Sequence, residues 1–503
     1  MGLSNFVAKA SSAVGGGQGA ASPSSSSKTA SASGTPMQPG AEDKIPDGAS
    51  ADDVEQLDDE PRNMLLALIS QLRPGMDLAR ITFPVFVLEP RSMLERVTDF
   101  HSHPELLHGA FNLEAPEDRF LQVLRYYLAG WHIKPKGVKK PYNPVLGEFF
   151  RCRYDYADGS AAYYIAEQVS HHPPISAWYF ASPEQGLELC GELRPKSKFL
   201  GNSAANIMEG ESHVRFLDGV GAKDGEYDIT MPNMYARGIL FGKMVLELGD
   251  SSIVRNETTG LSCDVEFKTK GFFSGSYNAI AGKIKGPKGD VGEISGHWNE
   301  LMEVSRKGGK GKEVLFDATK ADVVQKSVSP EAQQQPNESR RLWTKVTAAI
   351  KAKDLDAATD AKTEIEDAQR EQARERDARG EQWRPRFFKP SGKAGEWRPV
   401  FSLPQGDKAS QREAVREWIY GSDPEPSLPG AGGGARTAPA AAPAAPNSTA
   451  PLDTSSTSTT SSAAAASAEQ AEPSTPFYDA PAASPEQAAA AVEQQPAVPP
   501  SAL

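Results

Sequence analysis

Two adjacent histidines in the segment EQVSHHPP (167–174) are the side chains of this chain best suited to binding chemistry. Neighbouring side chains of a strand point to opposite faces, so His171 and His172 cannot reach one ligand from a strand interior. The two prolines that follow cannot donate ladder hydrogen bonds, so the strand must end here, at the rim of a sheet. There both imidazoles can turn toward one anion, most naturally phosphate. The alternative is a plain strand end with one buried and one exposed histidine.

A basic run, KPKGVKKP (134–141), precedes the segment NPVLGE and forms a second candidate site. Lysines attract phosphate as point charges, and an amide side chain can fix the orientation of the phosphate. Lys140 and Asn143 are therefore candidate anion ligands. The alternative is a solvated basic loop.

A third candidate site lies in a predicted helix near the C-terminal end of the folded region. Lys362, Glu366 and Arg370 are spaced at i, i+4 and i+8, which places them in one stripe. Glu366 is predicted to hold both cations by i,i+4 pairing while they face a ligand. The alternative is a set of ordinary surface ion pairs.

Motifs for covalent chemistry do not accompany these sites. Glu167 and His171 are four residues apart but lack the H-E-x-x-H arrangement of zinc enzymes, and Ser170 lies in no G-x-S-x-G elbow. The three cysteines have no paired spacing, which argues against a zinc site and for a reducing compartment. We expect no enzyme, no catalytic residue, no metal and no cofactor.

The elements that must position these ligands are predicted to be mainly β. Between residues 145 and 320, about ten short segments alternate apolar and polar residues between turn residues, as LSCDVEFKT (261–269) does. Such a meander usually removes its edges by closing, and a barrel of this size has room for a ligand. Helical patterns cover 92–132 and 339–379, and Gly380 ends the second.

Composition limits the folded part of the 503 residues. Residues 1–61 are predicted to be a disordered tail with an acidic end, and 431–503 a disordered Ala/Pro/Ser-rich tail. The folded domain is predicted at 62–402, followed by a linker at 403–430 with a short helix. The net charge of −12 excludes nucleic-acid binding driven by bulk electrostatics. No run of 18 apolar residues is present, so we expect a cytosolic protein that touches membranes without spanning them.

The candidate segments together resemble a known family. EQVSHHPP, KKPYNPVLGE (139–148) and KTEIEDAQR (362–370) are similar, in this order, to three motifs of the oxysterol-binding protein-related lipid-transfer family. The resemblance covers about residues 62–402. It implies an incomplete or near-complete antiparallel β-barrel around a lipid tunnel, an N-terminal lid at about 62–90 and C-terminal helices.

The resemblance also implies ligands. A phosphatidylinositol 4-phosphate headgroup would meet seven residues, which are Lys140, Asn143, His171, His172, Lys362, Glu366 and Arg370. Segments such as RPKSKFLGNSAA (194–205) are similar to the fungal members that exchange phosphatidylserine for phosphatidylinositol 4-phosphate. In that subgroup the serine headgroup would contact Lys140, Asn143 and Ser197. The implied lid residues are Leu78, Ile81, Phe83, Val85 and Val87, and the subgroup usually has leucine where Phe83 stands.

The function that follows is non-vesicular exchange of phosphatidylserine and phosphatidylinositol 4-phosphate between membranes. Contact with membranes is expected to be peripheral and transient, at sites where the endoplasmic reticulum meets the plasma membrane. Two alternatives stay open. One is a sterol/phosphatidylinositol 4-phosphate exchanger, and the other is a phosphoinositide-responsive regulator that binds lipid without net transfer.

Overall fold

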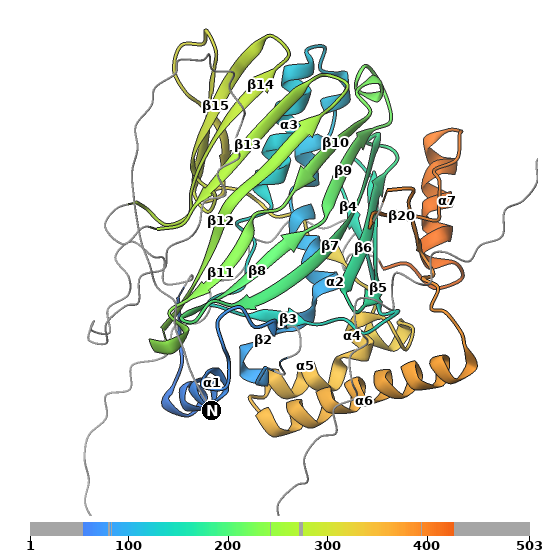
Figure 1. Ribbon diagram of the computed structural model, residues 1–503. Coiled ribbons are helices and arrows are strands. Elements are labelled where there is room, and N and C mark those ends of the chain that lie inside the picture. The colour runs from blue at the N-terminus through green and yellow to red at the C-terminus, as the bar shows by residue number, and fades with distance from the viewer. Residues whose placement is uncertain are drawn as a thin grey trace, which may run out of the picture. The chain divides into compact units, whose positions relative to one another are not determined.

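A large antiparallel sheet of 16 strands forms the body of the protein (Figure 1). The computed structural model describes residues 54–426 apart from 79–80, 82, 242, 271–274 and 394, and these residues belong to one compact unit. The strands of the sheet are β1 (Val54–Gln56), β4 (Phe149–Asp155), β5 (Ala161–His171), β6 (Pro174–Ser182), β7 (Leu187–Phe199), β8 (Ser203–Glu209), β9 (Glu211–Phe216), β10 (Glu226–Thr230), β11 (Asn233–Arg237), β12 (Lys243–Asn256), β13 (Leu261–Lys268), β14 (Ala279–Gly286), β15 (Gly289–His297), β16 (Leu301–Arg306), β17 (Glu313–Asp317) and β18 (Lys326–Ser327).

The order of the strands follows the chain closely, as expected for a meander. It runs β17-β16-β15-β14-β13-β12-β10-β9-β7-β6-β5-β4-β18. In addition, β8 pairs with the C-terminal half of β7, β11 pairs with the N-terminal half of β12, and β8 and β11 pair with each other. Residues of β13 alternate as predicted, with Cys263, Val265 and Phe267 buried and the residues between them facing solvent or partly exposed. The predicted fold class is therefore confirmed. The order has two free ends, β17 and β18, so the barrel is the incomplete form.

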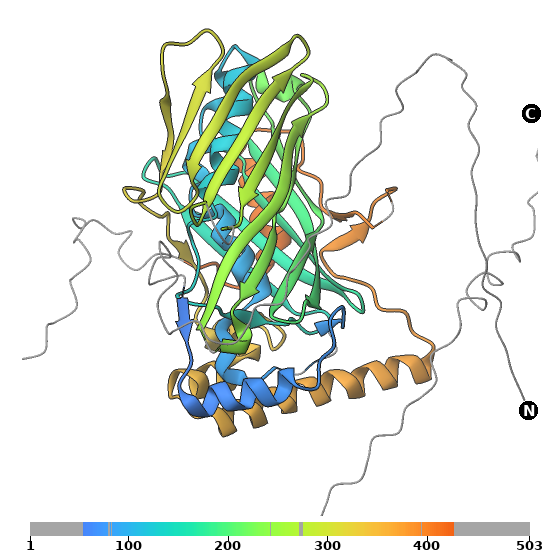
Figure 2. The ribbon, with the colours of Figure 1, turned by 60° about the vertical axis from the view of Figure 1, so that its left-hand side comes forward.

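Helical segments fill the concave side of the sheet (Figures 1 and 2). Side chains of α3, among them Phe120, Leu124 and Leu128, pack against inward-facing residues of the strands. An apolar cavity of about 30 Å³ remains here, between residues such as Tyr127 and Leu189. This volume suits a water molecule or two, so the predicted lipid tunnel stays a prediction. The segments are α2 (Met93–Arg96), η4 (Val97–His101), η5 (Pro104–Leu107), η6 (Ala110–Asn112), α3 (Pro116–Ala129) and η7 (Gly221–Lys223).

One end of the sheet is covered by the N-terminal segment and by helix α6 (Figure 2). Leu65 and Ile69 of α1 pack with Phe199 of β7 and Met244 of β12. The elements at this end are α1 (Asp59–Ile69), η3 (Val85–Val87), β2 (Leu88–Ser92), β3 (Lys140–Tyr142), η8 (Ile239–Phe241), η9 (Glu331–Gln333), α4 (Ser339–Leu342), α5 (Thr344–Lys351) and α6 (Leu355–Arg379). Helix α6 begins after Asp354, whose carboxylate accepts the Ala357 N–H, and Gly380 ends it as predicted.

The outer face of β5 and β6 is covered as well. The β19–β20 hairpin (Phe388–Pro390 and Trp397–Pro399) and α7 (Lys408–Tyr420) lie against it (Figure 1). Val415 and Ile419 of α7 pack there, so the helix predicted within a linker belongs to the folded body. Strands buried on both faces read as continuous apolar runs, which explains the sequence AAYYIA in β5.

The N-terminal boundary of the folded unit differs from the prediction. β1 pairs with β12, and α1 begins at Asp59, within the predicted tail 1–61. The segment before the lid is structured because its backbone adds a strand to the sheet. Residues 1–53 and 431–503, on which the rest of the tail predictions fall, lie outside the described residues. Among the helices that are described, none is both long and apolar enough to cross a membrane.

Candidate anion-binding pocket

The histidine pair lies at the turn between two neighbouring strands. β5 ends at His171 and β6 begins at Pro174, so the strand does end at the prolines. The two imidazole rings lie side by side, with centroids 4.7 Å apart and planes at 70°. His171 is half-buried and His172 is exposed. Both rings are therefore available at one point of the rim.

The NPVLGE segment is fastened beside this turn by backbone hydrogen bonds. The Gly147 N–H donates to the Gln168 carbonyl over 3.0 Å, and the Gln168 N–H donates to the Glu148 carbonyl over 2.8 Å. His171 Nδ1 lies 3.2 Å from the Pro144 carbonyl oxygen. The first and second predicted motifs are thus neighbours in space.

The third motif joins them through helix α6. The Leu146 N–H donates to Gln369 Oε1 over 3.1 Å, which fixes α6 to the NPVLGE segment. A pocket of about 450 Å³ opens between the three motifs. Its lining residues are Leu146, Val169, Ser170, His171, His172, Gln369, Arg370, Ala373, Arg376, Trp383 and Trp397.

Lys140 and Lys362 are not among the residues that line this pocket. The pKa of Lys140 is lowered, first by desolvation and then by the positive charge of Lys362, while Glu366 opposes the shift. The Lys140 side chain still reaches solvent, so water screens these interactions. The Lys140 ammonium lies 5.0 Å from the ring centroid of Phe83 in the lid. Asn143 is exposed close by in sequence.

The pairing within α6 differs from the prediction in one respect. Glu366 forms an ion pair with Lys362, as expected. Arg370 pairs instead with Asp367, with Nε 3.1 Å from Oδ1. A carboxylate three residues away on the same helix face is as near as one four residues away, and this frees Glu366 from Arg370. Glu366 then also influences His171, whose pKa it raises slightly against the larger effect of desolvation.

Ser197 lies apart from the histidines, on β7. Its hydroxyl donates to Asn206 Oδ1 of β8 over 3.2 Å. Residues two apart on a strand share a face, so Ser197 faces the same side as Phe199, which packs under the lid. The residues predicted for the two headgroups therefore fall into a rim group and a lid group.

Four of the five predicted lid residues fall into two packing groups. Leu78, Ile81 and Phe83 join the cluster of α1 and β7. Val85 is buried against Trp343 and Val346 of the C-terminal helices. Val87 is half-buried. Val85 therefore anchors the end of the lid to the helices instead of covering the sheet, because β2 already turns away there to pair with β3.

Two buried carboxylates position the pocket, and neither was among the predicted site residues. Glu148 accepts hydrogen bonds from Ser339 Oγ at 2.7 Å and Trp343 Nε1 at 2.9 Å. Glu167 accepts the backbone N–H groups of Arg386 and Phe387, each at 2.8 Å. Burial raises the pKa of both carboxyl groups, and these hydrogen bonds oppose the shift. An acid directly before an apolar strand, as in GEFF, or within one, as in AEQV, is the sequence signal that could have identified them.

Trp383 forms the remaining wall of the pocket. It belongs to the segment between α6 and β19 (residues 381–387), here called the return segment, whose Arg386 N–H donates to Glu167. Of the Trp383 surface, 39% is exposed. A Cβ at Gly147 would come within 2.5 Å of the Trp383 ring, and Gly147 has a φ of +77°. The glycine of NPVLGE is therefore required both by its backbone conformation and by the close approach of the tryptophan.

Gly147→Ala should displace Trp383 from the pocket. We expect a loss of about 1–3 kcal/mol in the free energy of unfolding and a shift in tryptophan fluorescence. Gly159→Ala is the matched control, since Gly159 has a φ of +85° and no atom within 4 Å of its added Cβ. Equal effects in the two variants would show that backbone strain alone is responsible.

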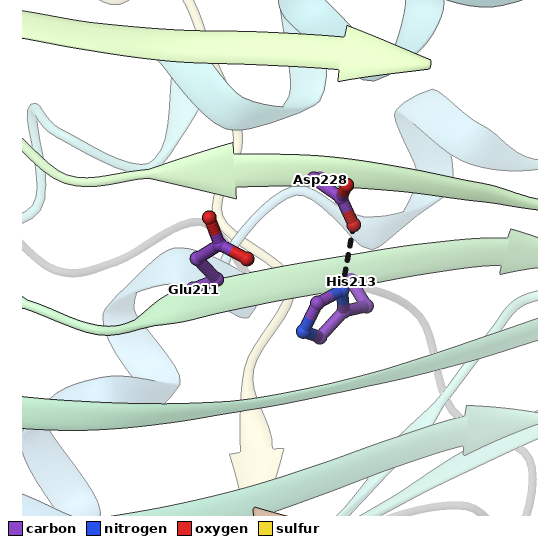
Figure 3. A group of neighbouring side chains, drawn as sticks. All are labelled: Glu211, His213 and Asp228. Atoms are coloured by element: carbon purple, nitrogen blue, oxygen red, sulfur yellow. Dashed lines mark hydrogen bonds and ion pairs between the residues drawn. The ribbon is translucent and has the colours of Figure 1, made fainter. Parts of the chain in front are cut away.

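A separate group of possible metal ligands lies on β9 and β10 (Figure 3). Ligand atoms of Glu211, His213 and Asp228 lie within 4.8 Å of one another. Arg255 already pairs with both carboxylates at 3.3 Å, and His213 Nδ1 lies 2.8 Å from Asp228 Oδ1. Both carboxylates thus already have a cationic partner within the protein, and the group is explained as an ion-pair network that joins β9, β10 and β12.

The fold and pocket define the class of protein: an incomplete antiparallel β-barrel with the N-terminal segment packed over one end and a pocket lined by His171, His172 and Arg370 at its rim. The chain belongs to the oxysterol-binding protein family, whose model, described as oxysterol-binding protein, matches residues 67–349 and 346–413. The resemblance predicted from the three motifs is therefore confirmed.

Fungal relatives share this chain's folded region. An oxysterol-binding protein homolog of Schizosaccharomyces pombe is 49% identical over 353 residues, covering 67% of this chain and 72% of that protein. Oxysterol-binding protein homolog 6 of Saccharomyces cerevisiae is 46% identical over 353 residues, covering 69% and 78%.

Solved structures agree with the fold. The Osh1 ORD domain in complex with cholesterol aligns with a TM-score of 0.56 and 25% identity, covering 71% of this chain and 90% of that chain. The Osh3 ORD of Saccharomyces cerevisiae in complex with PI(4)P gives a TM-score of 0.52 at 20% identity, covering 71% and 93%, and supports the fold alone.

Proposed function

We propose that the protein is a lipid-transfer protein that exchanges phosphatidylserine for phosphatidylinositol 4-phosphate between membranes. The observation that carries this proposal is the meeting of three separate motifs at one rim, around a pocket of about 450 Å³ that contains His171, His172 and Arg370. Such a volume and such donors suit a phosphorylated headgroup. Proteins similar in sequence are called oxysterol-binding proteins.

The lid supports a carrier. Burial of a CH₂ group is worth about 0.8 kcal/mol, so one long acyl chain left in water costs on the order of 10 kcal/mol. A carrier must therefore cover the chains during transit. Leu65, Ile69 and Leu78 form a continuous apolar layer with Phe199 at the end of the sheet. We propose that this layer closes over bound lipid while Lys140, next to Phe83, meets the headgroup.

Sterol exchange is the second candidate. The Osh1 ORD domain, 25% identical to this chain, was solved in complex with cholesterol and with ergosterol. The serine lipid is favoured here because Ser197 and Asn206 place polar groups under the lid. We further propose that the protein acts as a cytoplasmic, peripheral membrane protein where the endoplasmic reticulum and the plasma membrane meet, without catalysis or a cofactor.

Transfer of fluorescent lipids between liposomes tests the proposal. Wild type should move phosphatidylserine one way and phosphatidylinositol 4-phosphate the other. Ser197→Ala should reduce phosphatidylserine uptake about tenfold by the loss of a hydrogen bond to a charged headgroup, and leave phosphatidylinositol 4-phosphate uptake unchanged. Ser251→Ala, an exposed serine of β12, is the control. Uptake of sterol in place of phosphatidylserine would favour the second candidate, and binding without transfer would favour a regulator.

Headgroup binding should depend on pH through His171. Desolvation, followed by the charge of His172, lowers the pKa of His171 below its usual value near 6.5, so the ring is neutral at pH 7. Protonation of His171, at a pH below this lowered pKa, adds a hydrogen-bond donor and a positive charge, and a bound phosphate stabilises the protonated form. Without ligand, the unfolded chain binds a proton at His171 more readily than the folded protein does. Acidification below about pH 6.5 therefore lowers the free energy of unfolding.

We therefore expect headgroup affinity to increase from pH 7.5 to 5.5 relative to a variant with alanine at both histidines. Vesicle binding at constant ionic strength measures this difference. The phosphate itself titrates near pH 6 in both proteins, so the comparison cancels that effect. Parallel pH profiles would contradict a role of His171 in anion binding.

A further inference from the structure

The pocket extends beyond the residues predicted for a single phosphate. Past the histidine pair, its wall continues along α6 to Ala373 and Arg376 and ends at Trp383. Arg370 and Arg376 are six residues apart, a rise of about 9 Å along the helix. Arg376 thus lies further along α6 from Lys362 than Arg370 does. One phosphate at the histidines leaves this part of the pocket without a charged partner.

Arg376 differs from the other arginines of α6 in its surroundings. Arg370, Arg374 and Arg379 each pair with a carboxylate, Asp367, Glu371 and Glu375 respectively. Arg376 has no ion pair to a carboxylate within the described part of the chain, although the helix around it is rich in acids. Its positive charge is available to a ligand, in contrast to its neighbours.

The guanidinium of Arg376 is nevertheless held in place. It lies 5.6 Å from the ring centroid of Trp383, a cation–π distance. Trp383 in turn packs against Gly147, and its segment is fixed by the two backbone hydrogen bonds to Glu167. A cation that is oriented by packing and has no acidic partner is typical of a preorganised anion site.

We propose that Arg376, supported by Trp383, forms a second anion subsite, and that the pocket takes an inositol ring with two phosphates besides the one at position 1, one at the histidines and one at Arg376. This inference rests on the proposed headgroup site and extends its range to polyphosphorylated inositol. A volume of about 450 Å³ accommodates such a ring. The source of the ring is either a membrane lipid or a free inositol phosphate.

Calorimetric binding to the full-length chain tests the subsite with soluble inositol 1,4-bisphosphate and inositol 1,4,5-trisphosphate. Wild type should bind the trisphosphate about tenfold more tightly. Arg376→Gln should remove this preference and leave the bisphosphate affinity unchanged. Arg374→Gln, which removes an equal charge two residues away, should keep the preference. Arg376→Lys, which keeps the charge without the planar stack, should retain only part of it.

The outcomes separate the two levels of the proposal. Binding of both ligands without a preference in wild type would overturn the subsite and leave the headgroup site intact. An equal loss of affinity for both ligands in Arg376→Gln would show that Arg376 contributes to binding either ligand, and would also overturn the subsite. Failure of wild type to bind either ligand would contradict the headgroup site itself.

A vesicle assay distinguishes the two sources of the ligand. Vesicles with 5% phosphatidylinositol 4-phosphate or phosphatidylinositol 4,5-bisphosphate are incubated with wild type and Arg376→Gln, and lipid extraction is measured. A lipid source predicts extraction of the bisphosphate that falls about tenfold in the variant. Extraction equal in both proteins, combined with the calorimetric preference, would indicate a free inositol phosphate.

Discussion

Replacement of His171 and His172 together by alanine should reduce phosphatidylinositol 4-phosphate extraction by about 100-fold or more. Each imidazole offers a hydrogen bond to a charged group, worth about 1.5–3 kcal/mol, and two such bonds multiply in the affinity. The rings lie 4.7 Å apart at the mouth of the pocket, so one phosphate can meet both. Extraction from liposomes with a fluorescent reporter measures the loss.

The fold should survive this change. His172 is exposed, and His171 makes one long contact with the Pro144 carbonyl at 3.2 Å, so the unfolding free energy should change by less than about 1 kcal/mol. His297→Ala is the matched control, because His297 bonds Ser276 at 3.0 Å on β15 and lines no part of this pocket. Unimpaired extraction by the double variant would refute the headgroup assignment.

Glu148→Ala should have the largest effect on stability. Its carboxylate receives four hydrogen bonds, from Ser92 Oγ, the Val145 N–H, Ser339 Oγ and Trp343 Nε1. Its removal takes the acceptor from Ser92 Oγ, the Val145 N–H and Trp343 Nε1, while Ser339 Oγ keeps a bond to the Phe149 carbonyl at 3.2 Å. We expect the free energy of unfolding to fall by about 3–5 kcal/mol, since unsatisfied buried groups bear the full cost of desolvation. Urea denaturation followed by circular dichroism measures this.

Two further variants make the result specific. Glu148→Gln keeps one acceptor oxygen and the side-chain shape, so it should lose less, about 2 kcal/mol. Glu266→Ala removes an exposed acid of β13 whose nearest cation, Lys268, is 3.8 Å away, and should change stability by less than about 0.5 kcal/mol. A similar loss in Glu148→Ala and Glu266→Ala would exclude the hydrogen-bonded role of Glu148.

The two predictions address different levels of one arrangement. The histidines are on the surface of the pocket, where a ligand can meet them. Glu148 and Glu167 lie behind them and hold the loop and the return segment that form the walls. Substitution of the histidines should therefore reduce binding with little change in stability, whereas substitution of a buried glutamate should reduce both.

Local sequence determined much of this protein. Alternation in LSCDVEFKT predicted strand β13, because side chains of a strand point alternately to core and solvent. The two prolines after His172 predicted the turn that ends β5, because proline cannot donate a ladder hydrogen bond; Pro173 lies in the turn and Pro174 begins β6. Gly380 fixed the end of α6, because glycine readily adopts the left-handed conformation. These effects act over a few residues, so the sequence alone contains them.

The tertiary structure decided what these elements meet. Arg370 pairs with Asp367, and Val85 packs against the C-terminal helices. The packing of α6 and β2 selects these partners among several that are equivalent in the sequence. Glu148 and Glu167 became buried acceptors for groups some 190 and 220 positions away in the chain. Trp383 reached the pocket only through the return segment. Such contacts join distant segments by shape and desolvation, which no local pattern of residues records.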